Sequence, residues 1–228
     1  MGKNMQSLAE FRHNMIDGQL SPNQVLSSNI TAAMGVVPRE AYVPEAYKHA
    51  AYLDEAIQVD KQRFLVPPLL LGQLLEMMTP QPGQRVLVVG GATGYSAAVL
   101  HQMGAKVFLL EDSQHLANQA RQILTQQGLG TIEVHTGGLH AGWQAGAPYE
   151  RILIEGAIEQ VPATLTEQLS EGGRCSFVQV SNALPLDKHA RGFLVSLDKA
   201  PNGLNRHQGA SVASPILPEL CRKEGFTF

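Results

Sequence analysis

The sequence of 228 residues is poor in cysteine, in tryptophan and in charge. It holds two cysteines and one tryptophan, and charged residues make up 16% of the chain. Two cysteines, Cys175 and Cys221, do not make the disulfide framework of a small secreted protein, so we expect reduced thiols and a cytoplasmic location. The 44% of apolar residues is enough for a hydrophobic core, which argues against a disordered chain.

Long apolar runs and clusters of basic residues are also missing. The most apolar stretch, residues 64–78, contains Glu76 and two prolines, so it indicates a core helix with its lead-in and not a membrane span. Residues 1–20 carry polar side chains throughout and no apolar signal core. The net charge of -3, without a block of basic residues, argues against a nucleic-acid partner. The eight histidines lack metal-ligand spacing, so we expect no metal site.

From residue 85 onward, short apolar strands alternate with amphipathic helices. Strands are expected at 85–89, 106–110, 132–135, 151–154 and 174–180, and helices at 94–103, 113–127 and 162–170. This alternation predicts an α/β fold with a parallel sheet and helices on both faces. Further strands, at 192–197 and 226–228, are expected to lie antiparallel at a sheet edge.

The first part of the chain reads differently. Residues 1–65 predict a helical lobe, with helices at 5–17 and from Ser21-Pro22 to about residue 34. Pro67 and Pro68 then open a helix that ends at Met78. We expect this lobe to pack on a core of residues 66–228, so that the two parts form one structural unit.

The most informative stretch is the strand at 85–89 and the turn that follows it. The turn reads Gly90-Gly91-Ala92-Thr93-Gly94-Tyr95, and Glu111 closes the next strand about 20 residues later. Glycines let the backbone approach a nucleoside cofactor, and the acid accepts hydrogen bonds from the ribose hydroxyls. Ala92 and Tyr95 stand where a dinucleotide motif has glycines, so the spacing favours S-adenosylmethionine. A nicotinamide-dependent oxidoreductase and a turn that merely packs a helix on a strand are the alternatives.

Several segments, in order along the chain, resemble the protein-L-isoaspartate O-methyltransferases. They are residues 36–44 (VVPREAYVP), 51–54 (AYLD), 94–100 (GYSAAVL), 142–143 (GW), 147–152 (APYERI), 161–162 (VP) and 168–174 (QLSEGGR). The resemblance implies a class I, Rossmann-like methyltransferase that uses S-adenosylmethionine. It also implies a protein or peptide substrate with an isoaspartyl carboxylate, and hence protein repair. By the same resemblance, the cofactor lies on Gly90, Gly91, Ala92, Thr93, Gly94, Tyr95 and Glu111, with its adenine near Gly138 and Leu139.

The chain departs from this family at three positions. Val66 stands in place of the active-site serine, Val88 in place of the acid that opens the glycine motif, and Gly138 in place of an aspartate. No catalytic residue is therefore assigned. Candidate substrate-binding residues are Arg63, whose guanidinium can hold a carboxylate with two hydrogen bonds, together with Pro67 and Glu155.

These departures also motivate an alternative function. The chain would bind the cofactor but be catalytically altered or inactive, and would act on another substrate or as a sensor or interaction module. The sequence does not indicate an oligomeric state.

Overall fold

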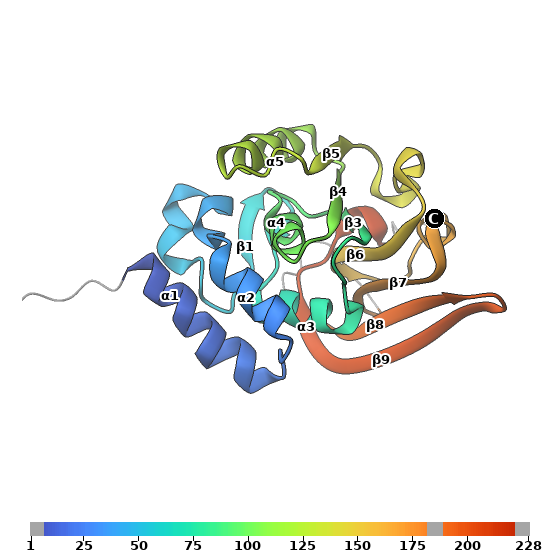
Figure 1. Cartoon of the computed structure of the whole chain (residues 1–228), viewed down its shortest axis with the longest axis horizontal. Coiled ribbons are helices and arrows are strands. Elements are labelled where there is room, and N and C mark those ends of the chain that lie inside the picture. Colours follow the sequence, from blue (N-terminus) through green and yellow to red (C-terminus); the bar gives the residue numbers. More distant parts are fainter. Residues whose placement is uncertain (1–6, 182–188, 222–228) are drawn as a thin grey trace, which may run out of the picture.

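The computed structural model describes residues 7–181 and 189–221. Seven strands form one sheet in the order β5-β4-β3-β6-β7-β8-β9 (Figure 1). Their bounds are β3 (Arg85–Val89), β4 (Lys106–Glu111), β5 (Glu133–Thr136), β6 (Tyr149–Ile158), β7 (Leu169–Gln179), β8 (Ala190–Ala200) and β9 (Gly203–Ser214). Strands β3 to β7 run parallel, and β8 and β9 pair antiparallel at one edge. The predicted α/β fold is confirmed.

The central strands are buried on both sides, and their alternating side chains feed two apolar layers. Val86 and Val88 belong to the layer under three helices, whereas Leu87 and Val89 belong to the layer on the opposite face. The three helices are α3 (Pro68–Met78), α4 (Tyr95–Gln102) and α5 (Gln114–Gln126). The opposite face is covered by α6 (Ala163–Glu167) and by the short helices η5 (Leu139–Ala141), η6 (Gln144–Gly146) and η7 (Pro218–Leu220). Helices thus cover both faces, as predicted.

The helix predicted at 113–127 is confirmed as α5. The Ser113 hydroxyl accepts a hydrogen bond from the Leu116 backbone N–H at 3.3 Å, which caps α5. Leu116, Ala120 and Leu124 lie buried on its inner face. This helix therefore starts directly after β4, so its first turn stands at the carboxyl edge of the sheet.

The N-terminal part contains short helices and a small two-stranded sheet beside the main one (Figure 1). Its elements are α1 (Leu8–Met15), η1 (Ile16–Leu20), η2 (Ser21–Asn23), α2 (Ser28–Val36), η3 (Arg39–Tyr42), η4 (Glu45–Ala50), β1 (Ile57–Asp60) and β2 (Arg63–Leu65). The continuous helix predicted from Ser21 to about residue 34 is wrong. The chain turns at Gln24, which has a left-handed φ of 67°, and α2 begins only at Ser28. Val25 packs tightly against Gly72 of α3, so tertiary contact overrides the local helix signal.

The C-terminal part also differs from expectation. Strand β7 begins at Leu169, so the helix predicted for 162–170 ends at Glu167, and β9 was not predicted. The strand expected at 226–228 lies outside the described residues. After β9 the chain turns back, and Ile216 pairs in parallel with Ala157 of β6 (Figure 1). Residues 215–220 therefore lie at the carboxyl end of the central strands.

No described helix has the length and apolar character that crossing a membrane requires. Within residues 7–181 and 189–221, no group of three histidine, cysteine, aspartate or glutamate side chains is arranged to hold a metal ion.

Candidate cofactor site

The glycine turn and Glu111 meet because β3 and β4 are parallel neighbours that end at the same edge of the sheet. The Gly90 N–H donates to the Leu110 carbonyl oxygen at 2.8 Å, and the Ala92 N–H donates to Glu111 Oε2 at 2.9 Å. Gly90 has a φ of 74°, in the left-handed region that favours glycine. At Gly91, a Cβ would lie 2.6 Å from a Leu109 methyl carbon. The turn therefore requires its first two glycines to bring the backbone against Glu111.

Arg63 holds the Glu111 carboxylate from the other side. Its Nη1 donates to Glu111 Oε1 and its Nη2 donates to Glu111 Oε2 at 2.8 Å, while Nη1 also reaches Asp112 Oδ1 at 2.6 Å. The same Nη2 donates to the Gly90 carbonyl oxygen at 2.7 Å. Burial raises the pKa of Glu111 to about 7, and the Arg63 guanidinium opposes that shift. Arg63, predicted to contact substrate, thus lies buried inside the predicted cofactor site.

The C-terminal segment covers the same turn. A Cβ on Gly90 would lie 3.0 Å from both δ-methyl carbons of Leu217 and 3.2 Å from Arg63 Nη2. Leu217 shares one buried apolar cluster with Leu220 and with Leu139, the residue predicted to lie near the adenine. Gly90, Glu111 and Leu139 are therefore covered by this chain's own side chains.

This arrangement does not fit S-adenosylmethionine. Glu111 is 0% exposed, and its two oxygens already accept four hydrogen bonds: two from Arg63, one from the Ala92 N–H and one from the Ser113 N–H at 3.2 Å. A carboxylate offers about four acceptor positions, so none is left for two ribose hydroxyls. The residue types suit the cofactor, but their present contacts exclude it.

The later residues of the turn point away from Glu111. The Thr93 hydroxyl donates to the Tyr42 carbonyl oxygen at 2.6 Å, which links the turn to η3. The Tyr95 ring packs edge-on against the Tyr42 ring, with 5.6 Å between centroids, and Gly94 lies against Leu124 of α5. These three residues join the turn to the N-terminal part and to α5.

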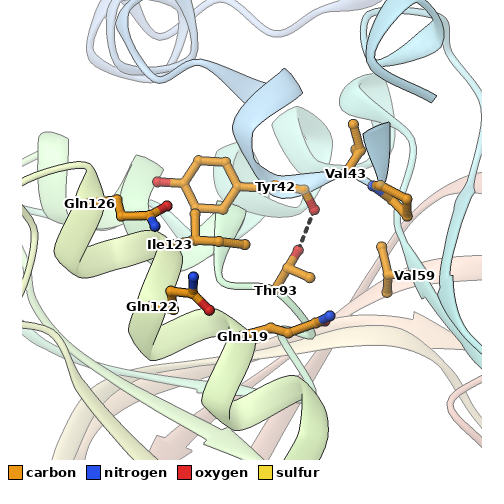
Figure 2. A pocket seen from close by; sticks show the side chains of 9 residues that line it. Tyr42, Val43, Val59, Thr93, Gln119, Gln122, Ile123 and Gln126 are labelled. Carbon is orange, nitrogen blue, oxygen red and sulfur yellow. Dashed lines mark hydrogen bonds between the residues drawn. The ribbon is translucent and has the colours of Figure 1, made fainter. Parts of the chain in front are cut away.

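A pocket of about 240 Å³ lies behind the turn, between η3 and α5 (Figure 2). Its polar lining comes mainly from three α5 side chains, Gln119, Gln122 and Gln126. Among the predicted cofactor residues, Thr93 alone lines it. This pocket therefore shares only Thr93 with the predicted cofactor site.

The remaining candidates are dispersed. Glu155 is buried beneath the turn, where its Oε2 would lie 3.4 Å from a Cβ on Gly91 and accepts a hydrogen bond from the Ser96 hydroxyl. Val66 is fully buried, and its carbonyl oxygen accepts from Arg39 Nη2 at 2.7 Å. Pro67 lines another cavity, with Asp54 and Val212, while Gly138 is exposed.

Sequence reasoning missed two residues at this site, Asp112 and Leu217. Asp112 directly follows Glu111, so the acidic pair was a usable local signal for a basic partner. Leu217 carries no such signal, because its position depends on pairing between β6 and a segment some 60 residues later.

Comparison with known proteins identifies the family. The sequence profile of "Protein-L-isoaspartate(D-aspartate) O-methyltransferase" matches residues 11–207. A protein-L-isoaspartate O-methyltransferase from Methylorubrum populi is 37% identical over 163 residues, which is 72% of this chain and 76% of that protein. The enzyme of the same name from Gloeobacter violaceus is 35% identical over 160 residues, 70% of this chain and 78% of that protein.

Solved structures agree on the fold. One protein-L-isoaspartate O-methyltransferase superposes with a TM-score of 0.75 at 23% identity; the match covers 92% of this chain, which spans 65% of that protein's length. A Plasmodium falciparum structure described as a β-aspartate methyltransferase, in complex with S-adenosyl-L-homocysteine, also has a TM-score of 0.75, at 15% identity, and covers 93% of this chain and 99% of its own. This chain therefore belongs to the protein-L-isoaspartate(D-aspartate) O-methyltransferase family of enzymes, for which S-adenosylmethionine is the indicated cofactor.

Proposed function

We propose that this chain methylates the isoaspartyl carboxylate of damaged proteins and peptides, with S-adenosylmethionine as the methyl donor, and so serves protein repair in the cytoplasm. The observation that carries the proposal is the family match over residues 11–207, which includes the glycine turn and Glu111. The same match does not favour a nicotinamide-dependent oxidoreductase or an inactive binding module.

The cofactor residues in this proposal are Gly90, Gly91, Ala92 and Glu111, with Leu139 beside the adenine. The Ala92 N–H bond to Glu111 supports this assignment, since it places the acid directly beside the turn. Thr93, Gly94 and Tyr95 support the turn through their contacts with Tyr42 and α5. Gly138 remains a backbone neighbour of Leu139 without a side chain to contribute.

The reaction is compatible with Val66 in place of a serine. An isoaspartyl carboxylate is ionised at neutral pH, so its oxygen needs no general base to become a nucleophile. Catalysis is then chiefly alignment of the reactants. A missing hydroxyl donor to a charged group is worth about 1.5–3 kcal/mol, so we expect a rate about tenfold to a hundredfold below that of an enzyme with the serine.

The test is a transfer assay on paired peptides. The protein is incubated with methyl-labelled S-adenosylmethionine and a peptide that contains isoaspartate, and in parallel with the same peptide containing aspartate. We expect base-labile label on the isoaspartyl peptide alone. Cofactor binding without label on either peptide would contradict the proposal.

A further inference from the structure

The groups proposed to hold the cofactor are buried under two parts of the same chain. Arg63 comes from β2, and Leu217 and Leu220 come from the segment after β9. These three residues are called the internal cover below. Arg63 and Glu111 are 48 positions apart in the sequence, so their contact is made by the tertiary fold alone.

Arg63 occupies both oxygens of Glu111, the residue proposed to bind the ribose. Its guanidinium presents two N–H groups to the two oxygens of Glu111, which is the bidentate geometry that two adjacent hydroxyl donors would otherwise take. The additional bonds to Asp112 Oδ1 and the Gly90 carbonyl oxygen hold the side chain in place. Since the Arg63 side chain is only 9% exposed, water does little to weaken this ion pair.

Leu217 and Leu220 supply the apolar part of the internal cover. Leu217 packs on Gly90, which has no side chain, and Leu220 belongs to the same apolar cluster as Leu217 and Leu139. Two backbone hydrogen bonds anchor the segment to β6: the Ala157 N–H donates to the Pro215 carbonyl oxygen at 2.7 Å, and the Leu217 N–H donates to the Ala157 carbonyl oxygen at 2.9 Å. The segment is held by these two bonds, by the Cys221 thiol and by the side chains of Ile216, Leu217 and Leu220. None of these contacts belongs to the ladder of the seven-stranded sheet, so the segment can detach while the sheet stays folded.

We infer that the internal cover is an autoinhibitory contact, which S-adenosylmethionine must displace before it binds. This inference rests on the proposed function. The chain exchanges a closed state, with Arg63 on Glu111, for an open state that alone accepts the cofactor. The apparent dissociation constant is then the intrinsic one divided by the open fraction, so loosening the cover tightens binding.

Calorimetry with S-adenosylhomocysteine tests this inference on the full chain. We expect Arg63→Gln to bind at least about tenfold more tightly than the wild type, because the neutral amide weakens the closed state. The matched control is Arg174→Gln, which breaks a similar two-bond pair, with Asp198 at 2.6 and 2.8 Å, between β7 and β8. Its affinity should equal that of the wild type. Equal or weaker binding by Arg63→Gln than by the wild type would overturn the inference.

Hydrogen exchange provides a second readout that needs no variant. Saturating S-adenosylhomocysteine should speed amide exchange in residues 215–220 of the wild type, because the Leu217 N–H loses its partner. Slower exchange there would mean that the ligand binds with the cover in place, and would overturn the inference even if Arg63→Gln failed to fold.

The two proposals fail differently. A wild type that methylates isoaspartyl peptide and binds as tightly as Arg63→Gln overturns the internal cover alone. Folded wild type, Arg63→Gln and Leu217→Ala proteins that all fail to bind S-adenosylhomocysteine overturn both the cover and the proposed function.

Discussion

Glu155 lies fully within the protein, under the glycine turn, without a cationic partner at hydrogen-bond distance among the described residues. Its Oε2 accepts from the Ser96 hydroxyl, and no described group bonds its Oε1. Burial raises the pKa of this carboxyl to about 7, and Ser96, Arg39 and Arg63 oppose that shift. A buried carboxyl group that accepts a single hydrogen bond is more stable protonated than ionised. Glu155 therefore supports the turn as a neutral acid over much of the acidic range, whereas its proposed contact with substrate finds no exposed surface here.

The pKa of Glu155 predicts how stability changes with pH. Between the unfolded pKa of about 4.5 and the folded pKa of about 7, the folded protein binds a proton that the unfolded chain has released, so stability falls as pH rises through that window. The free energy of unfolding falls by about 3 kcal/mol in total, and most of this decrease has occurred by pH 7. Glu155→Gln should remove this part of the slope in denaturant unfolding measured from pH 5 to pH 8. The same slope in both proteins would show that Glu155 is ionised when folded.

At the scale of elements, the parallel strands of the sheet and the helices between them were predictable, whereas β9 and several connections were not. The strand at 85–89 and α5 follow from apolar period and from the Ser113 cap, which are local signals. The break at Gln24 and the path of residues 215–220 depend on contacts with α3 and β6, which are distant in sequence. For the same reason the sequence predicted Arg63 as a ligand of the substrate carboxylate, and its contact with Glu111 was not foreseen.

The β7–β8 pair offers a test of close strand packing. A Cβ on Gly192 would collide with the Gln179 carbonyl oxygen of the neighbouring strand, and backbone atoms cannot move aside as a side chain can. Gly192→Ala should therefore destabilise the protein by about 1–3 kcal/mol, measured as a lower midpoint of urea unfolding. Gly35→Ala is the control: apart from its chain neighbours and the backbone of its own helix, no atom lies within 4 Å of its Cβ position, and alanine favours the helix. A similar shift for both variants would contradict the packing argument.

At the scale of the whole molecule, we propose that residues 1–65 and 66–228 unfold as one unit. Met15 and Tyr42 belong to the same buried cluster as Val86 of the sheet. Arg39 is fully buried in the N-terminal part, and it donates to the carbonyl oxygens of Ala51 at 2.8 Å and of Val66 at 2.7 Å. Separating the two parts would expose their shared apolar core to water and would break the hydrogen bonds of the buried Arg39. The two parts should therefore unfold together.

This proposal predicts a single unfolding transition. Trp143, the one tryptophan, stacks on His135 of β5 and reports on the sheet, while far-UV circular dichroism also reports on α1 and α2. The two urea curves should coincide. Arg39→Gln should shift both curves together to lower urea concentration. The free energy of unfolding should fall by about 2–5 kcal/mol, because two buried carbonyl groups lose a charged donor. Arg206→Gln, on exposed β9, should move neither. A fluorescence curve that stays in place while the circular dichroism curve shifts would mean that the N-terminal part unfolds on its own, and that Arg39 stabilises the lobe rather than its junction with the sheet.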